Sequence, residues 1–123
     1  MIAVAQSTDF LTTSEFARST DEYYRPTLES YPKGHYVYVV KDMSVSGYYK
    51  IGKTSEPHKR LTRFGILLPF EICIISILPC ANAAHLEKVL HEDHRHQRVR
   101  GEWFDLTGLD IGNIKWLERY LGK

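Results

Sequence analysis

Two runs of β-branched and aromatic residues lie close together in the middle of the chain. HYVYVVKD covers residues 35–42 and YYKIGK covers residues 48–53, and in a strand the side chains of each run alternate between two faces. The residues between them, Asp42 to Gly47, include two serines and a glycine, which are typical of turns. The pattern therefore predicts a β-hairpin.

A helix and a third strand are predicted after the hairpin. Residues 54–57 contain Thr, Ser and Pro, which signal the start of a short cationic helix that runs through Phe64 and is closed by Gly65. The apolar run PFEICIISIL, residues 69–78, then predicts a buried strand.

Two more helices and a short extended piece complete the pattern. Asn82 can cap a helix from Ala83 to about His94, GEWFDL at residues 101–106 predicts an extended segment, and residues 111–121 have helical spacing. The apolar stripes expected to face the core are Leu86, Val89 and Leu90 in the first helix and Ile111, Ile114, Leu117 and Leu121 in the second.

The start of the chain differs in character from the rest. Residues 1–33 combine Ser, Thr and acidic residues with one short helical pattern, LTTSEFARS, in which Thr12 or Thr13 could act as the cap. A helix-turn-helix would need a second apolar helix, and Pro26 leaves too little chain to build one. We therefore expect an N-terminal arm or helical extension, followed by one α+β domain over residues 34–123.

Composition fits this single domain. A chain of 123 residues that is 43% hydrophobic can bury one modest core. It contains neither an apolar run of the roughly 18 residues that a membrane span needs nor a signal-peptide start, so we expect a cytoplasmic protein with no membrane partner. Cys73 and Cys80 are the only cysteines, which suggests reduced thiols rather than a disulfide framework.

Charge is distributed unevenly along the chain. Residues 32–100 carry 11 basic and 6 acidic side chains, whereas residues 1–31 carry 2 basic and 5 acidic ones. A positive central region favours a polyanionic partner such as nucleic acid, although many ordinary domains show a similar imbalance.

The hairpin brings together two residues that could carry chemistry. Tyr38 and Lys50 lie on neighbouring strands, and a turn near residues 44 and 45 puts them opposite each other or one step apart. A nearby ammonium lowers the pKa of a phenol, so Tyr38 could act as a general base; the alternative is a packing residue with a solvated hydroxyl.

The two helices after the hairpin add further candidates. Arg60 and Arg63 lie one turn apart, where a guanidinium could bind a phosphate or simply remain on a solvated basic face. Glu87 lies beside an apolar stripe, with His91 one turn later, which suits a metal ligand at the edge of the core. One carboxylate forms only a weak Mg²⁺ site until a substrate phosphate adds ligands.

Histidines and arginines gather at the end of the second helix. His91, His94 and His96 match neither HExxH nor a C-x₂-C zinc pattern. They share this region with Arg95, Arg98 and Arg100, and we expect the group to compensate the helix C-terminus or to contact phosphates.

Several short motifs in order resemble the GIY-YIG endonuclease superfamily. They are YVYVV at residues 36–40, YKIGKT at residues 49–54, Arg60 eight residues after Gly52, and Leu86-Glu87. The strings EPHKRL, LEKVLHEDH and RGEWFDL are similar to the compact branch of that superfamily found in phages and bacteria, in which the second half-motif carries Lys.

This resemblance, which covers about residues 35–106, implies a fold and an activity. The implied fold is a three-stranded antiparallel sheet flanked by helices. The implied activity is metal-dependent hydrolysis of phosphodiester bonds in nucleic acid, preferably DNA, with Mg²⁺ or Mn²⁺ as the cofactor, in a bacterial or phage-infected cell. In the implied mechanism water attacks in line and leaves 5′-phosphate and 3′-hydroxyl ends.

By resemblance Tyr38 is the base, helped by Lys50, while Arg60 offsets charge on the phosphate and Glu87 holds the metal. His91 is a further catalytic candidate, and Glu102 is either structural or catalytic. The chain departs from the common pattern in having Tyr36 in place of a glycine, Lys50 in place of a tyrosine and Phe64 where many members have histidine, a gap that His58 or His91 could fill. The expected nucleic-acid-binding residues are Lys53, Lys59, Arg63, Arg95 and Arg98.

Two other functions are compatible with the same residues. One is a nucleic-acid-binding module that has lost its catalytic activity. The other is a regulatory protein that self-associates, or binds another protein, through its acidic N-terminal arm.

Overall fold

A computed structural model describes residues 11–12 and 31–121. Its strands form one antiparallel sheet in the order β1-β4-β2-β3-β6-β5. The strands are β1 (Leu11–Thr12), β2 (Tyr36–Asp42), β3 (Tyr49–Thr54), β4 (Ile72–Pro79), β5 (Arg98–Arg100) and β6 (Trp103–Phe104). The helices are α4 (Pro57–Leu67), α5 (Ala83–Asp93) and α6 (Gly108–Leu121), with a 3₁₀ turn η1 (Arg95–Gln97) after α5.

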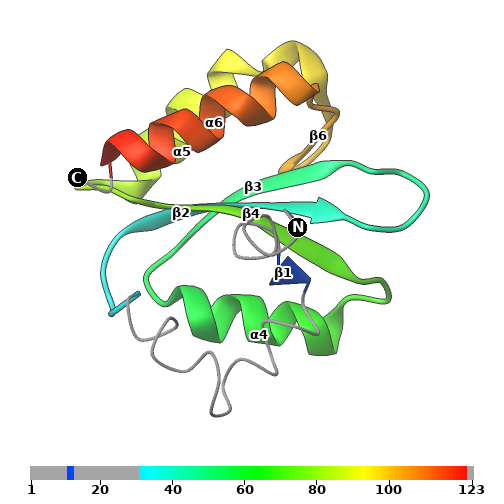
Figure 1. Cartoon of the computed structure of the whole chain (residues 1–123), viewed down its shortest axis with the longest axis horizontal. Coiled ribbons are helices and arrows are strands. Elements are labelled where there is room, and N and C mark those ends of the chain that lie inside the picture. Colours follow the sequence, from blue (N-terminus) through cyan, green and yellow to red (C-terminus); the bar gives the residue numbers. More distant parts are fainter. Residues whose placement is uncertain (1–10, 13–30, 122–123) are drawn as a thin grey trace, which may run out of the picture.

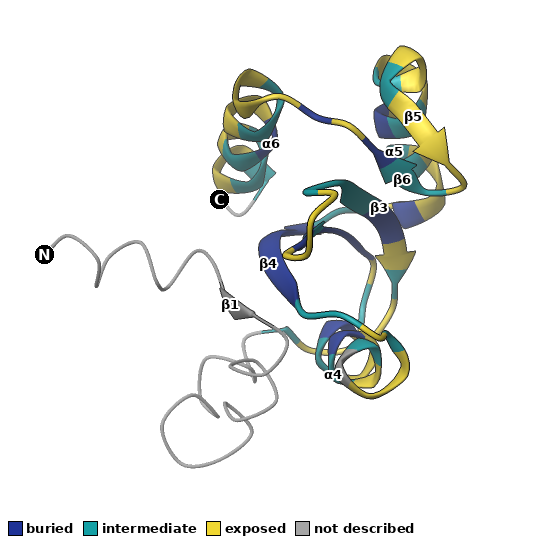
Figure 2. Ribbon diagram, turned by 90° about the vertical axis from the view of Figure 1, so that its right-hand side faces the viewer, coloured by how far each residue is buried: buried dark blue, intermediate teal, exposed yellow. Residues whose placement is uncertain are grey.

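Helices cover both faces of the sheet (Figure 1). α4 packs on one face, where Tyr38, Leu61 and Ile74 belong to one buried cluster. α5 and α6 lie on the other face, over a second cluster that includes Val39 and Ile114. Strand β2 at the centre is buried on both faces, and β5 lies at the exposed rim (Figure 2).

The predicted α+β class is confirmed, but the predicted strand count is wrong. The hairpin of β2 and β3 and the buried strand β4 form the centre of the sheet as expected. Residues 98–104 add a second small hairpin, β5 with β6, and Gly101 allows its turn by adopting a φ of 57°. Strands of three and two residues are too short to show a period in the sequence.

Some predicted boundaries also need correction. Gly65 does not close its helix, because α4 continues to Leu67. Arg98 and Arg100 are not at a helix end, since α5 stops at Asp93 and both arginines lie in β5. Val89, expected in the apolar stripe, is exposed.

Other local predictions are confirmed. The Asn82 side chain accepts a hydrogen bond from the backbone N–H of His85 and caps α5. Leu90 in α5 and Ile114 in α6 are buried as expected. Leu11–Thr12, at the start of the predicted helical pattern, instead forms a strand on β4, and residues 1–10 and 13–30 of the predicted arm lie outside the described residues. No helix in the described part of the chain is long and apolar enough to cross a membrane.

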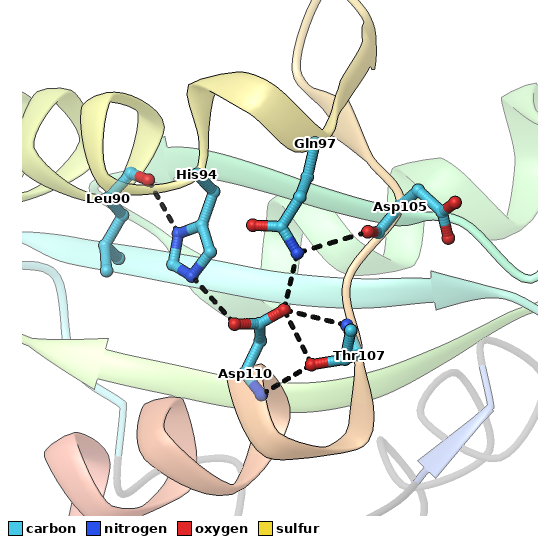
Figure 3. A network of polar contacts seen from close by, with 6 residues as sticks. All are labelled: Leu90, His94, Gln97, Asp105, Thr107 and Asp110. Carbon is cyan, nitrogen blue, oxygen red and sulfur yellow. Dashed lines mark hydrogen bonds and ion pairs between the residues drawn. The ribbon is translucent and has the colours of Figure 1, made fainter.

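A polar network holds the connection between α5 and α6 (Figure 3). The Asp110 carboxylate accepts hydrogen bonds from the Thr107 N–H and hydroxyl and from the Gln97 amide, and it lies 3.7 Å from a ring nitrogen of His94. Thr107 and Asp110 thereby form a capping box at the start of α6. The segments that this network joins lie before and after the hairpin of β5 and β6 in the sequence. The network therefore helps to fix the position of Glu102, which lies in the turn of that hairpin.

Candidate active site

Tyr38 lies directly across from Gly52 in the pairing of β2 with β3. A Cβ atom at Gly52 would meet the hydroxyl and ring of Tyr38 more closely than real Cβ atoms approach their neighbours. The absence of a side chain at Gly52 is therefore what lets the phenol lie over β3. The Phe64 ring, from α4, packs edge-on against Tyr38 with 5.7 Å between the ring centroids.

The Tyr38 hydroxyl is buried and surrounded by charges. The residue is 0% exposed, and no described residue meets full hydrogen-bond geometry with its hydroxyl, although the Arg60 guanidinium is close enough to favour the ionised phenol. Burial raises the pKa of Tyr38 to about 12; the negative charges of Glu102 and Glu87 act in the same direction, and the Arg60 guanidinium opposes them. Three charged side chains from three separate elements thus act on this one oxygen.

The relation expected between Tyr38 and Lys50 is not the one found. Lys50 lies across from Val40, two residues along β3 from Gly52. Its ammonium donates a hydrogen bond of 2.8 Å to Glu102 and lies 5.8 Å from the centre of the Trp103 ring. The expected pairing of Tyr38 with Lys50 is wrong, since the Lys50 ammonium is bound to Glu102, and the pKa of the phenol is raised rather than lowered.

Two carboxylates and an imidazole meet beside this phenol. One ligand atom from each of Glu87, His91 and Glu102 lies within 4.8 Å of the other two, so the group could bind a metal ion. Glu87 and His91 are one turn apart on α5, and Glu102 is in the turn between β5 and β6. Backbone contacts to Ile51 align the parts: the Ile51 N–H donates to the Glu102 carbonyl at 3.0 Å, and the Ile51 carbonyl lies 2.8 Å from His91 Nε2.

The two carboxylates differ in their partners. Glu102 is in contact with Lys50; burial alone would raise the pKa of this carboxyl, but the hydrogen bond and charge of Lys50, with His91 and Glu87, lower it instead. Glu87 Oε1 lies 3.7 Å from the exposed ammonium of Lys53. Glu87 Oε2 is buried, and no described residue meets hydrogen-bond geometry with it, although the Glu87 carboxyl is close enough to Glu102 to lower the pKa of that group.

A basic hollow opens next to Arg60. It has a volume of about 230 Å³ and is lined by Thr54, Ser55, Glu56, Lys59, Arg60 and Arg63. The arginines and Lys59 are exposed on α4, within about one turn of one another. A phosphate group bound here would lie beside the guanidinium that acts on the Tyr38 hydroxyl.

The sequence model of the T5orf172 domain matches residues 35–120. The chain belongs to this family. T5orf172 domains occur in phage and bacterial proteins that are similar to homing endonucleases and related to GIY-YIG nucleases, which associates the chain with a nuclease-like role and a nucleic-acid partner. No curated protein and no solved structure matches the chain significantly.

Within this T5orf172 domain the predicted site residues fall into two groups. Tyr38, Arg60, Glu87 and His91 are brought together with Lys50 and Glu102 around one edge of β3. Lys53 lies at the same edge through its contact with Glu87, and Lys59 and Arg63 line the basic hollow. Arg95 instead contacts Glu92, and Arg98 lies over the Phe104 ring.

Glu102 is the site residue that sequence reasoning left open. Its place depends on the short hairpin of β5 and β6, which has no periodic signal. The available sign was the order of Gly101 and Glu102: a glycine that can adopt a positive φ, directly before a carboxylate.

Proposed function

We propose that this T5orf172 domain is a metal-dependent endonuclease that hydrolyses phosphodiester bonds of DNA by in-line attack of water. One observation supports this above all. The fully buried Tyr38 hydroxyl has no described partner at full hydrogen-bond geometry, and the Arg60 guanidinium and the Glu87 and Glu102 carboxylates all act on it. A polar group that is kept dry and unpaired has a cost in stability, and such groups concentrate at sites that act on a ligand.

The residues beside Tyr38 fit a divalent cation. Glu87 offers a buried carboxylate oxygen without a described partner, and hard cations such as Mg²⁺ and Mn²⁺ prefer oxygen ligands. Glu87 would hold the metal. When bound, the ion would stabilise charge that develops on the leaving oxygen and would cancel carboxylate charge that raises the pKa of Tyr38.

The chain's own side chains would carry the remaining steps. In its ionised form, after its own proton has passed to solvent, Tyr38 would take a proton from the attacking water. Arg60 binds the scissile phosphate and offsets the charge that grows on it, and Lys59 and Arg63 hold the neighbouring backbone. Lys50 fixes the Glu102 carboxylate. Water would leave as part of a 5′-phosphate, with a 3′-hydroxyl on the other product.

Cleavage of defined substrates tests this proposal. Supercoiled plasmid and single-stranded DNA are incubated with the protein and Mg²⁺ or Mn²⁺, with chelator in parallel. We expect nicking or cutting by the wild type, and its loss with chelator and in Glu87→Gln and Tyr38→Phe. Lys41→Met is a suitable control, because Lys41 lies over the Tyr49 ring and is not part of the site. Wild-type protein that leaves every substrate intact, as Glu87→Gln does, would contradict the proposal.

A binding module is the second candidate, and Phe64 favours it. The position where many GIY-YIG nucleases have a histidine is occupied by a ring that only packs against Tyr38. In that case the basic hollow of α4 would bind DNA without cutting it. Binding by gel shift with no cleavage under any metal would select this candidate.

A further inference from the structure

We propose that Glu87, His91 and Glu102 together form a three-ligand site for a divalent transition-metal ion, in which Glu102 exchanges its bond to Lys50 for a bond to the ion. This deepens the proposed function, because it concerns the metal of that same site. It changes the expectation of a single carboxylate that holds Mg²⁺ weakly.

The spacing of the three side chains supports a shared ion. Their ligand atoms lie within 4.8 Å of one another. Ligands bound at about 2.1 Å from one ion are roughly 3 to 4 Å apart, so small side-chain rotations would close the site. The three residues lie on two elements that are held in place independently. One is the capped helix α5, and the other is the hairpin of β5 and β6, which is joined to β3 by the hydrogen bond from the Ile51 N–H.

The hydrogen bond of His91 suits a metal ligand. A metal-bound histidine usually donates its other ring N–H to a carbonyl or carboxylate, which fixes the tautomer and the ring orientation. His91 Nε2 lies 2.8 Å from the Ile51 carbonyl, an acceptor that requires the proton on this nitrogen. Nδ1 then keeps its lone pair, and the Phe104 ring, 5.0 Å away between centroids, limits rotation of the imidazole.

Two further observations support a cation at these carboxylates. The Glu87 side chain is only 13% exposed, and its Oε2 atom has no described partner at hydrogen-bond geometry, with the Glu102 carboxyl as its close neighbour. The Tyr38 hydroxyl is fully buried, has no described partner at full hydrogen-bond geometry, and is acted on by both carboxylates as well as by Arg60. Lys50 is the close counter-charge of Glu102, while Lys53 is half exposed and 3.7 Å from Glu87, where water screens it.

The ligand set predicts which ions bind. An imidazole with two carboxylates favours Mn²⁺ and the later transition ions over Mg²⁺, which prefers oxygen ligands and gives up its water reluctantly. Lys50 binds Glu102 Oε1 at 2.8 Å, so it competes with an ion that uses this oxygen, and its positive charge opposes a cation on either oxygen of the carboxylate. Removal of the lysine charge should therefore strengthen metal binding, even if it impairs cleavage.

Calorimetric titration of the full chain with Mn²⁺, without nucleic acid, tests the proposal. We expect one bound ion for the wild type and weaker binding of Mg²⁺. Glu102→Gln, which keeps the side-chain shape, should weaken Mn²⁺ binding by at least about tenfold, since even residues that only support a ligand cost that much. Lys50→Met should tighten it by roughly fivefold, through loss of the competing charge. Lys41→Met, equal in charge change but outside the site, should leave it unaltered.

The opposite results would overturn the three-ligand site. These are Mn²⁺ affinity in Glu102→Gln equal to that of the wild type, or affinity in Lys50→Met that is unchanged or weaker. Lys50→Gln, with thermal melting as a check on folding, repeats the second test should the Met variant not fold. Manganese binding without DNA cleavage would refute the nuclease but keep this site, whereas cleavage with normal Mn²⁺ affinity in Glu102→Gln would refute the site but keep the nuclease.

Discussion

The phenol of Tyr38 on β2 occupies the space that a side chain would fill at Gly52 on β3. The two residues face each other in the strand pairing, and the glycine is what allows the hydroxyl to lie near Arg60, Glu87 and Glu102. The Tyr-Val-Tyr and Lys-Ile-Gly motifs are thus linked by a close contact, not only by their order in the sequence.

Gly52→Ala should therefore damage both folding and activity. The new methyl group would displace the Tyr38 ring inside a packed core, which costs about 1 to 3 kcal/mol in the free energy of unfolding. A displaced hydroxyl should lower the cleavage rate by at least about tenfold. Urea unfolding and plasmid cleavage measure the two effects.

Gly112→Ala provides the matched control. This glycine lies within α6, where an added Cβ meets nothing within 4 Å. Alanine should stabilise the helix by about 0.5 to 1 kcal/mol and leave cleavage unchanged. Equal loss of activity in both variants would show that the contact between Tyr38 and Gly52 has no special role.

The raised pKa of Tyr38 predicts how cleavage depends on pH. With a pKa of about 12, the phenol is almost wholly protonated near neutral pH, and the ionised fraction grows about tenfold for each pH unit. At a saturating concentration of metal, the rate for the wild type should rise from about pH 6.5 to about pH 9. Tyr38→Phe should be slow and nearly independent of pH, and a steep rise that persists in this variant would assign the base to another group.

Prediction from sequence succeeded where the signal is local. The hairpin residues, the apolar run of β4 and the Asn82 cap each depend on neighbours in the chain, and all three elements are found. The partner of Lys50 could not be predicted in this way, because Glu102 is 52 residues distant in the chain and reaches β3 through strands of two and three residues. The alternation of side chains along a strand also cannot predict that Tyr38 is fully buried, because this burial depends on helix α4, which packs on that face of the sheet.

Asp110 should stabilise the fold in a pH-dependent way. Burial alone would raise the pKa of its carboxyl, but hydrogen bonds from Thr107 and Gln97, with the charge of His94, lower it below the ordinary value of 3.8. A lowered pKa in the folded state gives stability that is present above the unfolded-state pKa and is lost as the pH falls through the folded-state value. Asp110→Asn should cost about 1 to 2 kcal/mol at neutral pH, and this difference should shrink in acid. Urea unfolding across the pH range measures it, and a constant difference would contradict the role of the charge.

Lys115 supports the sheet at an irregular point. The register of β2 with β4 shifts between Val39 and Val40, so Ile75 has no partner in β2, and the Lys115 ammonium donates a 2.7 Å hydrogen bond to the Ile75 carbonyl. Lys115→Met keeps the apolar stem but removes the donor, so unfolding should become easier by about 1 to 3 kcal/mol. Arg119→Met, an exposed change on the same helix, should cost less than about 0.5 kcal/mol. Equal effects in chemical denaturation would contradict the supporting role.

Arg60 and Arg63 line the same hollow, but only Arg60 acts on the Tyr38 hydroxyl. Both arginines can contribute a phosphate contact, so Arg60→Gln and Arg63→Gln should each weaken DNA binding and reduce the slope of log affinity against log salt by about one. Arg60→Gln should in addition lower the rate with saturating DNA by about 100-fold or more, because its charge is needed as the phosphate gains negative charge. Arg63→Gln should keep this saturated rate within about threefold of the wild type. A contact from Arg63 that is equally strong in the ground and transition states affects only the DNA concentration needed for saturation, not the rate at saturation. Equal losses of the saturated rate would show that Arg60 binds DNA without a separate part in the reaction.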